Sequence, residues 1–233
     1  MSEPKKQTFD DYSDIYHERL TECLRAYGGR DAYYYTHLKI RWLLQLTRKH
    51  LGSSNDLTFL DLGCGTGTAE ADLCPYFKEG IGIDLSYKML KANECKAYNC
   101  HFLQGNVVEL PFRDNSFDLV FSITLLHHLP DDVLPRFFGE VHRVLKQGGL
   151  TVHFDHNPRN FLTRKIVDDC EYDRGATLRR LEQTATSMKT KFSFVVDYGY
   201  IIFVPAFLKF LEPMELILKK IPYGGQYFLA GKK

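Results

Sequence analysis

Three glycines at alternate positions follow a short apolar segment, and this pattern limits the fold of the chain more than any other feature. The segment covers residues 59–62 and contains one acid, Asp61, and the glycines are Gly63, Gly65 and Gly67. Glycine reaches backbone dihedral angles that are closed to other residues, so a ligand can lie against bare main chain where a helix begins. The pattern predicts a nucleotide-binding turn between a strand and a helix.

The spacing of these glycines separates three kinds of nucleotide site. A dinucleotide-binding fingerprint, G-x-G-x-x-G, needs a glycine where this chain has Thr68. A phosphate-binding loop needs a Lys-Ser or Lys-Thr pair after the glycines, and none follows. The pattern that remains is D-x-G-x-G-x-G, which starts at Asp61.

A second predicted strand ends in an acid about twenty residues after the glycine turn, where a ribose-binding carboxylate belongs. This strand covers residues 80–84, and its last residue, Asp84, can accept hydrogen bonds from both ribose hydroxyls. Ser86 is expected to cap the following helix. Met89, in the first turn of that helix, has a flexible apolar side chain that can lie against an adenine ring.

Five motifs in order resemble those of the class I S-adenosylmethionine-dependent methyltransferases, most closely the branch that contains ubiquinone- and menaquinone-type and many small-molecule enzymes. They are the glycine turn, the strand that ends at Asp84, residues 106–108, the segment 116–130 and residues 145–152. The resemblance is strong over residues 57–155 and looser outside them. The chain departs from the family at Asn106, where Asp is usual, because Asn keeps an acceptor oxygen but loses the charge.

The resemblance implies an α/β fold, a Rossmann-like doubly wound sheet of seven mostly parallel strands with an antiparallel last strand. An amphipathic helix over residues 133–145, closed by Gly148, and an apolar helix over 208–221 are also expected. The expected strands are residues 58–61, 80–84, 100–105, 117–123, 150–155, 191–196 and 226–230.

Two segments outside this core are expected to cover the site, since ligands of open α/β sheets bind at the carboxyl ends of the strands. Residues 1–56 form a helical lid in this interpretation, and residues 57–233 form the S-adenosylmethionine-binding domain. An insertion after the fifth strand, about residues 156–190, would cover the substrate.

S-adenosylmethionine is the cofactor that the resemblance implies. Its contacts would come from the main chain of the glycine turn, from the acids that end the first two strands, from side chains beside the adenine and from lid tyrosines. Because a sulfonium methyl group is already activated, no metal is expected. The implied cofactor-binding residues are Tyr12, Tyr16, Asp61, Gly63, Cys64, Gly65, Asp84, Leu85, Met89, Asn106, Val107 and Ile123.

Histidines at or after the ends of the fourth and fifth strands are the candidate general bases, because histidine exchanges protons near neutral pH. His156 is preferred, because it lies just past a strand end, where the loop faces the substrate space. His128 is the second candidate, and His127 is expected to be structural. The two-residue period of a strand puts His153 with Asp155 on one face and Phe154 with His156 on the other, and one of these pairs can be satisfied core residues.

Length and charge set the remaining expectations. A chain of 233 residues fits one α/β domain, and its net charge of +1 disfavours a nucleic-acid partner, so a small-molecule substrate is expected. No segment reaches the ~20 apolar residues that span a bilayer, which favours a cytoplasmic protein. The six cysteines contain no C-x-x-C pair, so reduced thiols are expected. The oligomeric state is left open.

The leading function is methyl transfer from S-adenosylmethionine to a small molecule, with oxygen favoured over nitrogen or carbon as the acceptor atom. One alternative is a catalytically silent binding or scaffold subunit, which the intact Asp61 and Asp84 disfavour. The other is a nicotinamide-dependent oxidoreductase, which Thr68 disfavours.

Overall fold

The fold is a seven-stranded sheet between helices. The computed structural model describes residues 10, 13, 15–27, 29–93, 95–203 and 215–233. The strands are β1 (Thr58–Leu62), β2 (Glu79–Asp84), β3 (Cys100–Gln104), β4 (Phe117–Ile123), β5 (Leu145–His156), β6 (Phe194–Ile201) and β7 (Gln226–Lys232). The helices are α1 (Tyr16–Ala26), α2 (Ala32–Leu51), α3 (Thr68–Leu73), η2 (Cys74–Tyr76), α4 (Tyr87–Lys91), η3 (Leu126–His128), α5 (Leu134–Val144), α6 (Phe161–Asp169), η4 (Glu171–Asp173), α7 (Leu181–Met188) and α8 (Glu215–Leu218).

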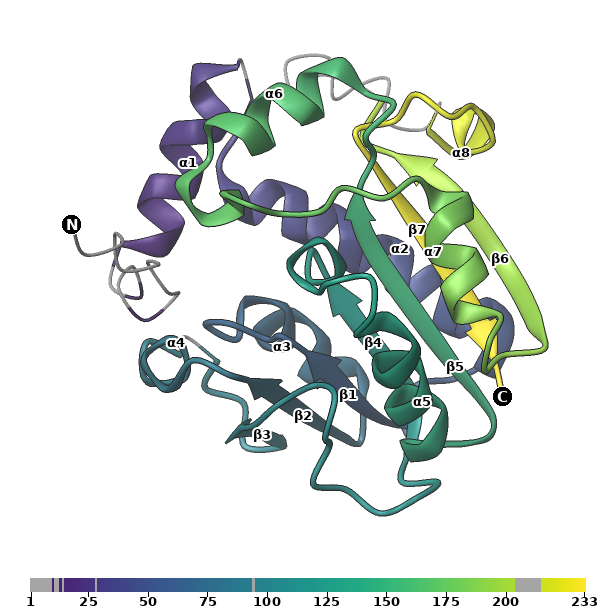
Figure 1. Ribbon diagram of the computed structural model, residues 1–233. Helices are drawn as coiled ribbons and strands as arrows, with labels where there is room; N and C mark the ends of the chain where they lie inside the picture. Colours follow the sequence, from purple (N-terminus) through teal and green to yellow (C-terminus); the bar gives the residue numbers. More distant parts are fainter. Residues whose placement is uncertain (1–9, 11–12, 14, 28, 94, 204–214) are drawn as a thin grey trace.

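The strand order is β3-β2-β1-β4-β5-β7-β6, and the first five strands of the chain pair in parallel (Figure 1). Strand β7 runs antiparallel to both neighbours, β5 and β6. The predicted doubly wound sheet with an antiparallel last strand is confirmed. The order reverses between β1 and β4, and this switch point is where open α/β sheets bind their ligands.

The predicted boundary between α5 and β5 is wrong. Helix α5 ends at Val144 and β5 begins at Leu145, whereas the sequence placed the helix end at Gly148 and the strand start at residue 150. The extra strand residues are held by pairing, because Leu145 lies opposite Phe117 and the Gly148 N–H donates to the carbonyl of Lys233 at 2.9 Å. Helical periodicity could not report these long-range bonds.

Helices cover both faces of the sheet (Figure 1). Helices α5 and α7 bury Phe137, Phe138 and Met188 on one face, and α2 with α3 buries Leu43 and Leu73 on the other. Helix α2 is therefore a layer of the core, and the covering role expected of residues 1–56 belongs to α1. The division of the chain at residue 56 stays a prediction.

Helices α1 and α6 lie side by side above the carboxyl edge of the sheet (Figure 1). The Cys23 thiol of α1 contacts the carbonyl of Ile166 in α6 at 3.8 Å, and the hydroxyl of Tyr27 donates to the carboxylate of Asp169. The N-terminal helix and the insertion after β5 thus form one cover. Tyr12 and most of the expected helix over residues 208–221 lie outside the described residues, apart from α8 and the turn after it.

The expectation that all cysteines are reduced is wrong for one pair. Cys74 and Cys100 are joined by a disulfide, with their Cα atoms 6.3 Å apart. Cys74 lies in η2, just before β2, and Cys100 begins β3, which pairs with β2. The sheet brings together two cysteines that are 26 residues apart, and sequence spacing does not reveal this proximity.

Among the described helices, none has the length and apolar character needed to cross a membrane.

Candidate functional site

The glycine turn after β1 has the backbone conformation that its sequence predicts. Gly63, Gly65 and Gly67 have φ angles of 77°, 56° and 73°, in the left-handed region that favours glycine. A Cβ atom on Gly63 would lie 2.8 Å from Cδ1 of Leu125, so a side chain there would collide with the loop after β4. The turn is anchored to β2, because the Gly63 N–H donates to the carbonyl of Ile83 at 2.8 Å.

A cavity of about 510 Å³ lies at the carboxyl edge of the sheet, beneath α1 and α6. Its walls contain every predicted site residue that the structure describes, from both the cofactor set and the candidate bases. These are Tyr16, Asp61, Gly63, Cys64, Gly65, Asp84, Leu85, Met89, Asn106, Val107, Ile123, His128 and His156.

Asp61 is a buried acid at the glycine-turn end of the cavity. Its side chain is 2% exposed, and its Oδ1 atom has no hydrogen-bond partner among the described residues. Burial raises the pKa of Asp61 well above its usual range, and the nearby carboxylate of Glu70 adds to the rise. An unpaired buried acceptor is costly, so this atom suits a ligand that donates hydrogen bonds or carries positive charge.

The ends of β2 and β3 form the adjoining wall. Asp84 accepts the Gly65 N–H through Oδ2 and the Ser86 N–H through Oδ1, both at 2.8 Å. Each carboxylate oxygen can accept a further bond, so both remain able to bind hydroxyls. Asn106 uses its Oδ1 atom to accept the Val108 N–H at 3.1 Å, in a turn of its own backbone.

The two side chains expected beside an adenine differ in burial. Met89 is 3% exposed, and its amide is held by the Ser86 hydroxyl at 3.1 Å, the predicted helix cap. Leu85 also lines the cavity, but 71% of it is exposed. Only Met89 is therefore enclosed by the protein itself.

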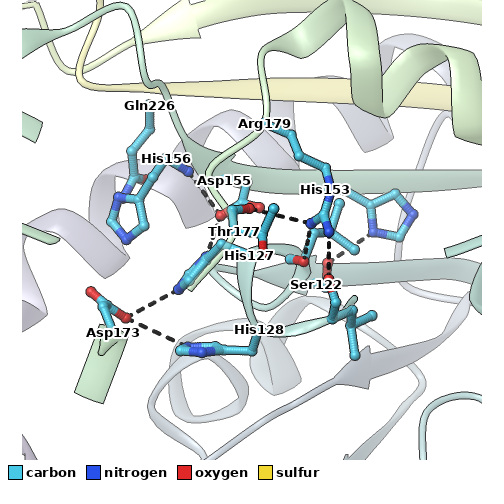
Figure 2. Close-up of polar contacts among 12 residues, drawn as sticks. Ser122, His127, His128, His153, Asp155, His156, Asp173, Thr177, Arg179 and Gln226 are labelled. Atoms are coloured by element: carbon cyan, nitrogen blue, oxygen red, sulfur yellow. Dashed lines mark hydrogen bonds and ion pairs between the residues drawn. The ribbon is translucent and has the colours of Figure 1, made fainter. Parts of the chain in front are cut away.

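His127 is the centre of the polar network at the other end of the cavity, where β4, β5 and the insertion meet (Figure 2). Its Nδ1–H donates to Asp155 at 2.5 Å, and its Nε2–H donates to Asp173 at 3.1 Å. Burial disfavours its charge, but the two carboxylates outweigh burial and raise the pKa of His127 to about 9. His127 is thus an imidazolium that ties η4 to the end of β5.

The two candidate bases flank this cation. The ring of His128 lies 4.0 Å and that of His156 4.8 Å from the ring of His127, measured between centroids. Burial, reinforced by the charge of His127, lowers the pKa of His128 and of His156 to about 4. Both are neutral imidazoles at neutral pH, so each can accept a proton, but only from a group that releases it readily.

His153 is a satisfied core residue. Its two ring nitrogens contact the hydroxyls of Ser122 and Thr151, both at 2.8 Å, and burial lowers its pKa to about 3. Asp155, on the same strand face, holds His127 and the amide of His156. The strand period grouped these two residues correctly, although it could not identify the partner of Asp155.

Several cavity residues were not predicted from the sequence. His17 in α1 contacts the hydroxyls of Thr66 at 2.7 Å and Thr68 at 3.1 Å, so the cover is attached to the glycine turn. Asp173 comes from the insertion, and Lys39 comes from the middle of α2. A lysine between Leu38 and Ile40 in an apolar helical stretch was the one signal available for Lys39.

Two β-branched residues of the cavity wall have left-handed backbone angles. Thr124, directly after β4, has φ 53°, and Ile202, directly after β6, has φ 63°. This conformation is uncommon for such residues and costs of order 1–3 kcal/mol where it occurs. Strain of this kind concentrates at functional sites.

Two groups of side chains have the composition of metal ligands. They are Cys74, Cys95 and Cys100, and His127, His128 and Asp173. In the first group two sulfurs already form the disulfide. In the second, both nitrogens of His127 are hydrogen-bonded to carboxylates, so a metal ion would have to displace the proton between His127 and Asp173.

Comparison with known proteins identifies the fold and the glycine turn. Residues 60–153 match the model of a family described as methyltransferase domain. These residues contain the glycine turn, the ends of β2 and β4, and the adjacent histidines His127 and His128. This region is a methyltransferase domain.

Relatives of this methyltransferase domain have varied names. An uncharacterized methyltransferase of Synechocystis is 35% identical over 51% of this chain and 56% of its own length. A cycloartenol-C-24-methyltransferase of rice is 26% identical over 74% of this chain and 56% of its own length. A demethylmenaquinone methyltransferase of Lactococcus lactis is 39% identical over 46% of this chain and 44% of its own length. The chain therefore spans about half the length of the curated relatives it matches.

Solved structures share the fold of the whole chain. A methyltransferase of Thermotoga maritima aligns with this chain at a TM-score of 0.67 and 20% sequence identity. The alignment covers 97% of this chain and 98% of the Thermotoga chain. At that identity the likeness concerns the fold, including α1 and the insertion, and it says nothing of the substrate.

Proposed function

We propose that this chain transfers the methyl group of S-adenosylmethionine to a small-molecule acceptor. The observation that carries the proposal is the single cavity that joins the glycine turn to the histidine network. Its two ends come from different strands, β1 to β3 at one end and β4, β5 and β7 at the other, on the two sides of the switch point.

The glycine-turn end fits the cofactor. Gly63 and Gly65 line the cavity without side chains, and the Oδ1 atom of Asp61 has no partner among the described residues. Both carboxylate oxygens of Asp84 can accept further bonds. In our assignment Asp61 meets the amino group, Asp84 holds the ribose hydroxyls, and Met89 covers the adenine. When bound, S-adenosylmethionine supplies a methyl group activated by a positively charged sulfur.

Further members of the cofactor set have assigned roles. Asn106 and Val107 meet the edge of the adenine, Leu85 lies beside it, and the main chain of Ile123 borders the methionine part. Tyr16 closes the cavity from α1, with its ring 5.1 Å from that of Tyr172 in the insertion.

The histidine end is assigned to the acceptor. Its residues align the acceptor, exclude water, and remove a proton where the acceptor carries one. We assign proton removal first to His156 and second to His128. The low pKa of both suits an acceptor whose proton is acidic, because a weak base cannot ionise an ordinary alcohol.

Two measurements test this function. Titration calorimetry with S-adenosylhomocysteine and, separately, with NADH should show binding of the first compound only. A transfer assay with a ¹³C-methyl donor then identifies the acceptor atom from the chemical shift of the product methyl. The sequence favours oxygen, whereas the rice relative is named for methylation at a carbon. Binding without transfer to any acceptor would support the silent subunit instead.

Replacing His156 by Ala should lower turnover by about 10²- to 10⁴-fold, the range for a general base, while S-adenosylhomocysteine affinity changes little. The matched control is His101→Ala, which removes an exposed histidine of β3 outside the cavity. If turnover of the His156 variant equals that of the control, the proton is removed elsewhere or no base is needed.

A further inference from the structure

Lys39 is a buried cation without a counter-charge in contact. Its residue is 4% exposed, it lines the cavity, and no described residue forms a hydrogen bond or ion pair with its ammonium. Arg179 shows how this protein otherwise treats a buried cation. At 3% exposure, its guanidinium donates to the Asp131 carboxylate at 2.6 Å and to the Leu126 carbonyl at 2.8 Å.

Neither of the nearby acids, Asp155 and Asp173, forms an ion pair with Lys39. Asp155 is the acid whose charge acts on it, but Asp155 is held by His127 at 2.5 Å and by the amide of His156 at 2.8 Å. Asp173 is bound to His127 at 3.1 Å. Burial therefore dominates and lowers the pKa of Lys39 to about 8. An ammonium that is buried without a partner is costly, unless a ligand supplies the missing charge.

Gln226 adds a second unpaired group to the same end of the cavity. Strand register places it opposite His156, and its Nε2 atom lies 3.3 Å from Nδ1 of His156. Its Oε1 atom is buried and has no partner among the described residues. The cavity thus offers an ammonium donor and an amide acceptor that no described residue uses.

We propose that Lys39 binds an anionic oxygen group of the methyl acceptor, and that Gln226 accepts a hydrogen bond from a hydroxyl or N–H on the same molecule. The acceptor is then a small acid or an ionised phenol or enol. The assignment to the acceptor rests on the proposed function, whereas anion binding at Lys39 does not. It also agrees with the low pKa of His128 and His156, because an acid, phenol or enol can give its proton to a weak base.

Calorimetric titration of the full chain, with and without S-adenosylhomocysteine, tests the proposal. The probes are benzoate, 4-nitrophenolate and inorganic phosphate, with neutral benzamide as the uncharged comparison. At least one anion should bind, and Lys39→Met should weaken its affinity by tenfold or more while benzamide binding is unchanged. The anion that binds distinguishes a carboxylate, a phenolate and a phosphate as the group recognised. The control is Lys49→Met on the same helix, because Lys49 pairs with Asp197 and lies outside the cavity.

Thermal stability distinguishes a binding role of Lys39 from a structural one. If Lys39 stabilised the fold, its replacement would lower the midpoint of thermal unfolding. Lys39→Met should raise the midpoint of thermal unfolding, since it replaces a buried ammonium with an apolar side chain of similar length. The proposal is overturned if no probe anion binds, if Lys39→Met leaves anion affinity intact, or if it destabilises the protein. If S-adenosylhomocysteine binds and methyl transfer occurs but no anion binds, this inference is wrong and the proposed function stands. If an anion binds through Lys39 but S-adenosylhomocysteine does not bind, the proposed function is wrong and anion binding at Lys39 stands.

Discussion

Replacing His127 by Gln should lower the free energy of unfolding by about 3 kcal/mol near pH 5. The imidazolium holds Asp155 at 2.5 Å and Asp173 at 3.1 Å, and its removal leaves two buried carboxylates without their shared cation. The magnitude follows from the rise in the pKa of His127 to about 9, at about 1.36 kcal/mol for each pH unit above its ordinary value. Urea unfolding at fixed pH measures the change.

The pH dependence of this loss identifies its cause. Because the folded pKa of His127 is raised, its contribution is fully present below about pH 6.5 and disappears as the pH rises through about 9. The pKa of Asp173 is lowered to about 2, mainly by its hydrogen bond to His127 working against burial. Its contribution is present above its ordinary value of 3.8 and is lost as the pH falls through about 2. The stability difference between wild type and variant should therefore be largest between about pH 4 and pH 6.5.

His153→Gln is the matched control for this experiment. It removes a buried histidine of β5 that is neutral and bonded only to hydroxyls. We expect it to lower stability without the decline between pH 6.5 and 9 that characterises the His127 difference. A His127 difference that stays flat across that interval would show that the residue is not an imidazolium in the folded protein.

Asp84→Ala should weaken S-adenosylhomocysteine binding by 1 to 3 kcal/mol, or about five- to 150-fold, the range for losing a charged hydrogen-bond acceptor. The structure adds a second reason, because Asp84 also holds the amides of Gly65 and Ser86 at 2.8 Å. The loss thus combines the ribose contacts with a looser glycine turn. Calorimetric titration measures it.

Two comparisons separate those contributions. Asp84→Asn keeps one acceptor oxygen and should fall between wild type and Asp84→Ala. Asp132→Asn removes an exposed acid outside the cavity and should leave affinity unchanged. Equal affinity in wild type and Asp84→Ala would refute the ribose assignment.

The glycine-turn end of the cavity could be predicted because it is local in sequence. Gly63, Gly65 and Asp84 act through backbone conformation and position at a strand end, and both properties are visible in spacing. The seven strands were predicted from short, largely apolar segments together with the family resemblance. The end of α5 was misplaced because Leu145 is held by a strand partner far along the chain.

The histidine end of the cavity could not be predicted because its charges depend on contacts between distant segments. His127 was expected to be structural, and Asp155 and Asp173, 28 and 46 residues away, give it a charge that the sequence does not reveal. The two histidines chosen as bases have low pKa values because of that cation and their burial. Lys39 was overlooked, since a lysine in an amphipathic helix is ordinarily exposed.

The sequence by itself determined the α/β architecture and the glycine-turn end of the cavity, because alternating glycines and strand-ending acids act through the local backbone. Only the tertiary structure decided which histidine is charged, which cysteines are joined and which lysine faces the cavity without a partner. Each of these depends on burial and on the distance between groups brought together by folding. A linear pattern of residues does not contain either quantity.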